Sequence, residues 1–159
     1  MAGRITKAEE QLKPDPKFNS KVLSRFINCV MHDGKKAVAQ RVVYKALDII
    51  EKRTNGDPSS IDVFNKAVSN VRPEVEVRSK RVGGANYQVP MSVKIKRKQS
   101  LAFRWILNAV RSEKGKPMAV RLAKELMDAS KGEGKAVNTR EQTHRMAEAN
   151  KAFAHFGNW

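Results

Sequence analysis

The stretch from residue 72 to residue 98 constrains the fold most, because here the helical spacing of apolar residues gives way to alternation. Val75 and Val77 flank a charged residue, and Tyr87 and Val89 flank a polar one. This pattern predicts two antiparallel strands, with Val77 opposite Tyr87 and Val75 opposite Val89. Two strands alone are marginally stable in water, so such a hairpin must pack against a helical body or against a partner.

The connection between these strands is predicted to be basic and flexible. It runs through Lys80, Arg81 and Val82 to Gly83 and Gly84, and paired glycines suit a turn that needs left-handed backbone. Because this Gly-Gly pair does not stand between a strand and a helix, it is not a nucleotide-binding loop.

The same region carries the densest positive charge of the chain. Between residues 72 and 104 nine side chains are basic and two are acidic, within a chain of formal net charge +16 and pI about 10.3. A field of this sign favours a polyanionic partner, and phosphate backbone is the commonest one. Since aromatic residues make up only 6% of the sequence, recognition of backbone and shape is favoured over base stacking.

The rest of the chain predicts six helices with apolar stripes. Asn19 or Ser20 caps the first, Asp57-Pro58 starts the third, and Ser92 precedes the fourth. The expected helices span about 20–33, 36–53, 58–72, 93–111, 117–131 and 136–153, and their stripes include Val38 in the second, Trp105 in the fourth, and Val137, Thr143, Met146, Ala147 and Ala154 in the sixth.

The sixth predicted helix has little core to bury, because its stripe is mostly small or polar. Phe153, Phe156 and Trp159 crowd its polar end. We interpret them either as a lid on the body or as a docking surface for another macromolecule.

The sequence therefore predicts a mainly α fold, a six-helix body with one protruding two-stranded antiparallel β-hairpin arm and a flexible N-terminal tail. Residues 1–18 lack periodicity and contain Pro14 and Pro16, so we expect a basic tail there, with Arg4 and Lys7 available to a target. Residues 19–159 form one expected helical domain, with the arm at about 73–90.

Catalytic chemistry is not indicated. No nucleophile with a base, paired carboxylates or metal-ligand cluster occurs at a convincing spacing, so we expect no enzyme activity, cofactor or metal. The single cysteine, Cys29, excludes an internal disulfide and is expected to be a small buried hydrophobe. A chain without a long apolar segment is expected to be soluble.

Two other function classes remain open at this level. A basic β-arm on a helical body could embrace the minor groove of DNA as an architectural protein, which predicts self-association. An RNA-modifying enzyme would need acid-base or cofactor groups that the sequence does not offer.

Several long strings show that the chain resembles the bacterial small-subunit ribosomal protein seven family. They cover nearly the whole sequence, with departures in the tail, in the loop 112–116 and in the last three residues. The matching residues are Ser20, Val22, Phe26-Ile27, Gly34-Lys35-Lys36, Val42-Val43 and Ala46, and the segments 14–18, 71–73, 81–84, 87–90 and 146–155.

The resemblance implies a six-helix body with a β-hairpin arm and a structural role in the cytoplasmic ribosome. It implies binding to the 3′ major domain of small-subunit rRNA, nucleation of head assembly, an arm beside the exit-site tRNA, and contact with the small-subunit protein numbered eleven. The implied RNA-binding residues are Lys35, Lys36, Arg72, Arg78, Lys80, Arg81, Lys94, Lys96, Arg97 and Lys98, and those of the protein-partner surface are Met146, Asn150, Phe153 and Phe156. Arg4 and Lys7 of the basic tail are predicted RNA-binding residues from their charge.

Overall fold

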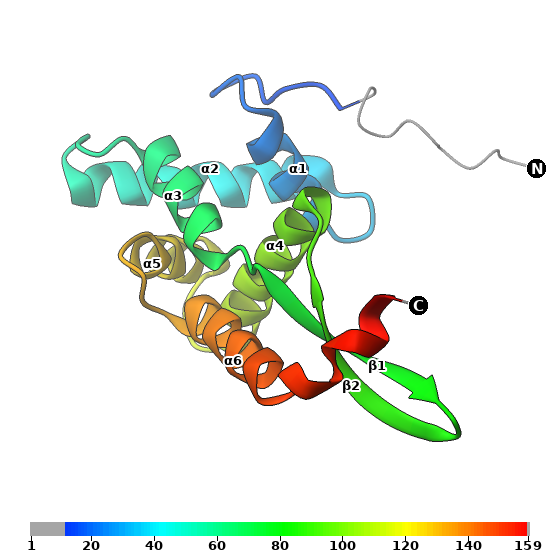
Figure 1. The fold of residues 1–159 in the computed structure, drawn as a ribbon. Coiled ribbons are helices and arrows are strands. Elements are labelled where there is room, and N and C mark those ends of the chain that lie inside the picture. The colour runs from blue at the N-terminus through cyan, green and yellow to red at the C-terminus, as the bar shows by residue number, and fades with distance from the viewer. Residues whose placement is uncertain (1–11, 159) are drawn as a thin grey trace, which may run out of the picture.

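The computed structural model describes residues 12–158, and it confirms the mainly helical body with a two-stranded antiparallel arm (Figure 1). The elements are α1 (Lys21–Val30), α2 (Lys36–Thr54), α3 (Ser60–Val71), β1 (Val75–Val82), β2 (Ala85–Ser92), α4 (Ile95–Ser112), α5 (Met118–Ser130), α6 (Lys135–Ala149) and the 3-10 helix η1 (Lys151–Asn158).

Serine side chains start two of the helices. Ser20 accepts a hydrogen bond from the backbone N–H of Leu23 at 3.2 Å and caps α1 as predicted. Ser59 caps α3 by accepting from the N–H of Asp62, so the predicted start at Asp57-Pro58 is wrong by two residues. The reciprocal contact, from the Ser59 hydroxyl to the Asp62 carboxylate at 2.7 Å, explains why the cap falls there.

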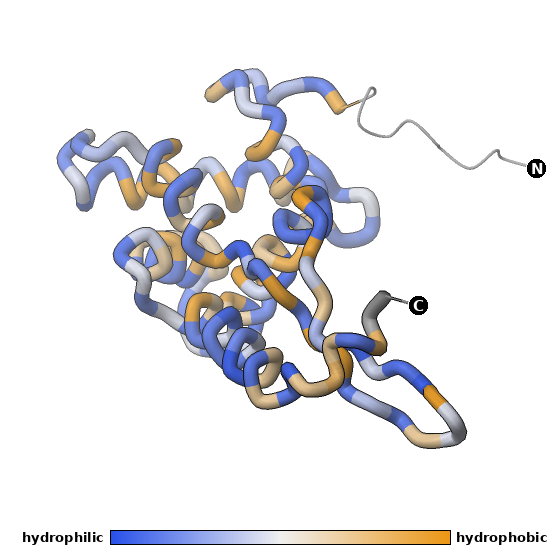
Figure 2. The backbone as a smooth tube through the Cα atoms, in the orientation of Figure 1, coloured by the Kyte–Doolittle hydropathy of each residue, from blue (hydrophilic) through white to orange (hydrophobic). Residues whose placement is uncertain are grey.

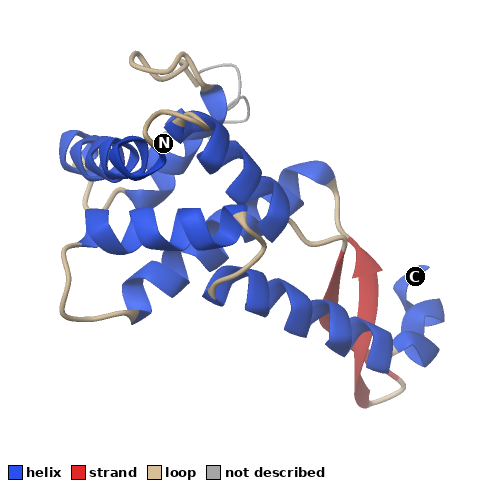
Figure 3. Cartoon of the chain, turned by 90° about the vertical axis from the view of Figure 1, so that its left-hand side faces the viewer, coloured by secondary structure: helices blue, strands red, loops and turns tan. Residues whose placement is uncertain are grey.

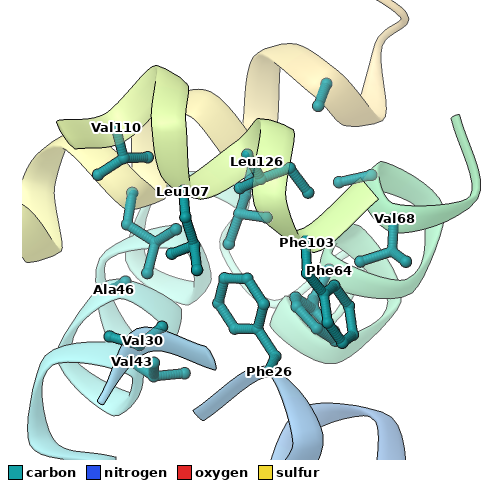
Figure 4. Close-up of a cluster of buried hydrophobic side chains, with 14 of the residues drawn as sticks. Phe26, Val30, Val43, Ala46, Phe64, Val68, Phe103, Leu107, Val110 and Leu126 are labelled. Carbon is teal, nitrogen blue, oxygen red and sulfur yellow. The ribbon is translucent and has the colours of Figure 1, made fainter. Parts of the chain in front are cut away.

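Three phenylalanines join the helices at the centre of the core (Figure 4). The ring of Phe26 on α1 lies 5.3 Å from that of Phe64 on α3 and 5.2 Å from that of Phe103 on α4. The predicted stripe of the fourth helix missed Phe103 and also Leu107, which is buried as well. Figure 2 shows apolar and polar residues interspersed along the helices, a pattern typical of helices with one buried face.

Several residues predicted to face the core do not. Val38 is 53% exposed, Met146 is 54% exposed and Thr143 is only half-buried, whereas Trp105 is half-buried and packs against the core as predicted. Cys29 is exposed, against the prediction that it is buried, because Val30 rather than Cys29 continues the apolar stripe from Phe26.

The hairpin register differs from the predicted one. Val77 lies opposite Pro90, Arg78 opposite Val89, and Lys80 opposite Tyr87. The strands run to Val82 and Ala85, so only Gly83 and Gly84, at φ +57° and +88°, form the turn. The apolar residues predicted to share one face are thus divided between the two faces of the arm. A change of register by an odd number of positions moves the side chains of one strand to the other face.

The C-terminal end also departs from prediction. The sixth helix ends at Ala149 rather than Phe153, and η1 turns back against β2 (Figure 1). Ala154, predicted to face inward, is exposed. Among residues 12–158, no helix is long and apolar enough to cross a membrane.

Asp15 docks the segment before α1 onto α2, although the sequence assigned it to the tail. Its buried carboxylate accepts from the backbone N–H groups of Lys17 and Phe18, both at 3.1 Å, and from the hydroxyl of Tyr44 at 2.7 Å. Phe18 packs against the core and meets Tyr44 edge to face. The expected flexibility of residues 1–11 falls outside the described part of the chain.

Replacing Asp15 should therefore destabilise the whole body. Asp15→Ala leaves two N–H groups and the Tyr44 hydroxyl without their acceptor, so we expect a loss of about 1–3 kcal/mol of unfolding free energy in urea titrations. Glu148→Ala is the matched control, because Glu148 joins Lys151 in an ion pair in which both side chains are 74% exposed. Equal effects of the two changes would contradict the docking role.

Candidate nucleic-acid interface

A buried carboxylate fixes the base of the arm to α4. The side chain of Glu76 on β1 is only 11% exposed, and its Oε2 accepts from Nε and Nη2 of Arg97 at 3.3 and 3.1 Å. Its Oε1 lies 2.5 Å from Nη2 of Arg78. Two predicted RNA-binding arginines thus converge on one carboxylate, with part of each guanidinium left open to solvent, since the side chains are 41% and 52% exposed.

Glu74 ties the same base to two helices. Its carboxylate pairs with Lys98 of α4, which lowers the pKa of Glu74. Its backbone N–H donates to Nε2 of His144 on α6 at 3.1 Å, and its carbonyl accepts from the N–H of Val93 at 3.0 Å. The arm therefore leaves the body at a fixed position rather than on a free linker.

The outer half of the arm is held by the C-terminal segment. The Tyr87 ring lies 5.3 Å from Phe153 and 5.1 Å from Phe156, and Nζ of Lys80 donates to the Phe156 carbonyl at 2.8 Å. Lys80 is thus half-buried, whereas Arg81, on the other face of β1, is exposed.

The start of α4 presents cations and free backbone donors together. Lys94 stands at the N-cap without a side-chain cap bond, and no acidic residue lies in the first turn. Lys94 and Lys96 are exposed, and Ile95 between them is 81% exposed. Uncapped N–H groups and the helix dipole add to the positive charge here, which makes this end of α4 attractive to phosphate.

The predicted basic residues do not form one continuous patch. Arg25 of α1 donates to Gln99 near the start of α4, whereas Arg111 near its end donates to the Val30 carbonyl. The exposed pair Lys35 and Lys36 therefore follows α1 at the far end of α4, an 18-residue helix about 27 Å long.

Other predicted site residues have different surroundings. Arg72 is half-buried, Met146 is exposed and Asn150 is half-buried, while Arg4 and Lys7 lie outside the described residues. Sequence reasoning missed His144, because its contact with Glu74 joins positions 70 residues apart and no local pattern signals it. Within residues 12–158, no group of His, Cys, Asp or Glu side chains could hold a metal ion.

Comparisons with known proteins point to one family. The family model for ribosomal protein S7p/S5e matches residues 2–151, which include every element from α1 to α6. Small ribosomal subunit protein uS7 of Rhodopirellula baltica is 60% identical over 154 residues, covering 97% of this chain and 98% of its own. Proteins of the same name from Magnetococcus marinus (53% identical, 98% and 99% covered) and Salinibacter ruber (55%, 91% and 91%) are also similar.

Removing the buried carboxylate should loosen the arm. Glu76→Ala leaves Arg97 and Arg78 without their shared acceptor, so we expect a loss of about 1–3 kcal/mol in urea unfolding and faster amide exchange in β1 and β2. Glu148→Ala is the control, since that side chain is 74% exposed and does not contact the base of the arm, so its removal should cost at most about 1 kcal/mol. Unchanged exchange in the arm of Glu76→Ala would contradict the clamp.

His144 should make the arm's attachment sensitive to acid. Burial, with Arg140 nearby, lowers the pKa of His144 in the folded protein. The unfolded chain thus binds the proton first, so stability is complete above the unfolded pKa of about 6.5 and falls as pH drops toward the folded pKa. Protonation also removes the acceptor for the Glu74 N–H.

We therefore expect the melting temperature of the native chain to fall more between about pH 7.5 and pH 5 than that of His144→Gln, whose amide does not titrate. The exposed His32, changed to Gln, serves as control and should keep the native pH dependence. Identical pH profiles for the native chain and His144→Gln would contradict the role of His144 in the acid sensitivity.

Proposed function

The chain belongs to the ribosomal protein S7p/S5e family, and from this premise we propose that it binds the 3′ major domain of small-subunit rRNA, nucleates head assembly and places its arm beside the tRNA exit site. As a member of this family it is a structural, non-enzymatic component of the small ribosomal subunit and a partner of its rRNA. It acts in the cytoplasm, as part of the ribosome.

The observation that carries the proposal is the junction of the arm with the uncapped start of α4. Lys94 and Lys96 are exposed there, and Arg78 and Arg97 stand beside them with their orientation fixed by Glu76. Fixed guanidinium groups and free backbone donors suit phosphates held in a defined three-dimensional arrangement. This supports recognition of a folded RNA junction by shape.

The remaining basic residues extend the proposed interface. Lys35 and Lys36 would meet a second RNA segment at the far end of α4, Arg81 would reach outward from the arm, and Arg72, Lys80 and Lys98 would border the junction. Arg4 and Lys7 would add contacts from the tail. We propose that residues 19–159 act as a single RNA-binding domain and that residues 1–18 are a basic tail, whose last part docks on α2 through Asp15.

A protein neighbour is proposed for the C-terminal region. Met146 offers an exposed apolar side chain on α6, with Asn150 at the end of that helix. Phe153 and Phe156 contact the arm within the chain and are half-buried. The small-subunit protein numbered eleven is the proposed partner for this surface.

Binding to an rRNA fragment that contains the 3′ major domain tests the function. If about six phosphates are neutralised, log K should fall against log salt with a slope of roughly −4 to −5. Lys94→Gln with Lys96→Gln should make the slope shallower by about two and weaken binding roughly tenfold or more at low salt. An RNA lacking the domain should compete poorly.

The matched control is Lys45→Gln with Lys52→Gln, which removes two exposed lysines from α2 and should leave the slope nearly unchanged. A slope near zero for the native chain would refute electrostatic RNA binding. Equal losses of affinity for the two double variants would mean that the phosphates do not bind at the start of α4.

A further inference from the structure

A basic groove lies on the side of the body away from the arm. It has a volume of about 730 Å³ and runs between the end of α2, the loop before α5 and α5 itself. A second hollow of about 370 Å³ adjoins it, since Arg53, Met127 and Lys131 line both. In Figures 1 and 3, α5 and the adjoining end of α2 are separated from the hairpin by the rest of the body.

The groove carries uncompensated positive charge. Six of its ten lining residues are basic and two are acidic. Of the acidic pair, Glu113 is shared, at 3.8 Å each, between Lys124 and Lys135. Apart from Lys124 and Arg121, the basic side chains of the groove take part in no ion pair or hydrogen bond within residues 12–158, and these are Arg53, Lys114, Lys116 and Lys131.

Arg121 builds the groove rather than contributing a free charge. Its Nη1 donates to the Val110 carbonyl at 2.9 Å and also to the Glu113 carbonyl. These bonds fix the end of α4 and the loop that follows it against α5. The lysines at 114 and 116 are therefore presented from an anchored loop, and Pro117 caps the next helix.

The floor of the groove is aliphatic. Val120 and Met127 line the larger part, and Pro58 and Val63 line the adjoining hollow. No aromatic side chain lines either part, so a single-stranded nucleic acid would find no stacking platform. Asp128 and Glu113 stand among the cations, where they would repel a continuous row of phosphates.

We infer that this groove binds an acidic peptide segment of another protein, one in which carboxylates alternate with aliphatic side chains. Carboxylates would pair with Arg53, Lys116 and Lys131 on the rim, and aliphatic side chains would cover Val120 and Met127. The site is separate from the proposed RNA interface at α4, so the chain could hold rRNA on one side and a protein partner on the other.

The test uses the full chain and a dye-labelled peptide of about twelve residues, built from glutamate with interspersed leucine, with a glutamine-for-glutamate peptide as its neutral control. Anisotropy gives affinity, and amide shift changes locate binding. Lys116→Gln with Lys131→Gln should weaken binding about five- to tenfold at low salt. Lys45→Gln with Lys52→Gln, which removes the same charge from an exposed helix face, should leave affinity within about twofold.

Amide shifts confined to residues 113–131 and the end of α2, lost in the groove variant alone, would support the site. Absence of peptide binding, equal losses in the two variants, or shifts centred on residues 94–98 would overturn it. Tighter binding of an oligouridine of equal charge in the same groove would also overturn it, in favour of an RNA site. Binding of both double variants to the rRNA fragment, measured in parallel, keeps this outcome separate from that of the proposed function.

Discussion

The arrangement of the arm depends on one buried carboxylate. Glu76 stands where β1 leaves the body, and without it Arg97 on α4 and Arg78 on the strand would repel each other. A two-stranded hairpin has no core of its own, so its direction must be set at the base. Placing a carboxylate between two arginines sets that direction and also fixes the guanidinium groups that the proposed RNA contact needs.

The arm is attached to the body on both sides of its base, because a hairpin without a core of its own must be held there. On one side α4 supplies Arg97 and Lys98, and on the other α6 supplies His144. The aromatic residues of η1 then cover Tyr87 farther out. This explains why α6 has so few large apolar residues. Its first turns pack on the body through Ala136 and Val137, while its later turns bury Ala147 and hold the arm through the hydrogen bond between His144 and Glu74.

The sequence predicted the helices, the hairpin and the turn glycines, because apolar periodicity and local capping act over a few residues. It did not predict the register. Counting Lys80 to Gly84 as the connection placed Tyr87 opposite Val77, whereas the left-handed backbone at Gly83 and Gly84 alone makes the turn. The alternation of apolar and polar residues within each strand could not decide between the two registers, because it does not say how one strand is aligned with the other. Partners such as Glu76 with Arg97, far apart in the chain, have no local pattern at all.

The basic composition likewise predicted a polyanionic partner, but it did not predict where the positive charges lie in the folded chain. Basic side chains of the same type have different roles in the folded chain. Arg97 and Arg78 are oriented by a carboxylate, Arg121 is hydrogen-bonded to the main chain, and Lys94 is exposed at the start of a helix. A cation beside a helix N-terminus opposes the dipole and costs a few tenths of a kcal/mol, which a bound phosphate would offset. The exposed cations at the start of α4 therefore carry a small folding penalty that the proposed RNA contact would relieve. Those around Val120 and Met127 stand over an aliphatic floor, and this difference in surroundings, rather than in charge, is what separates a surface suited to phosphate from one suited to a peptide.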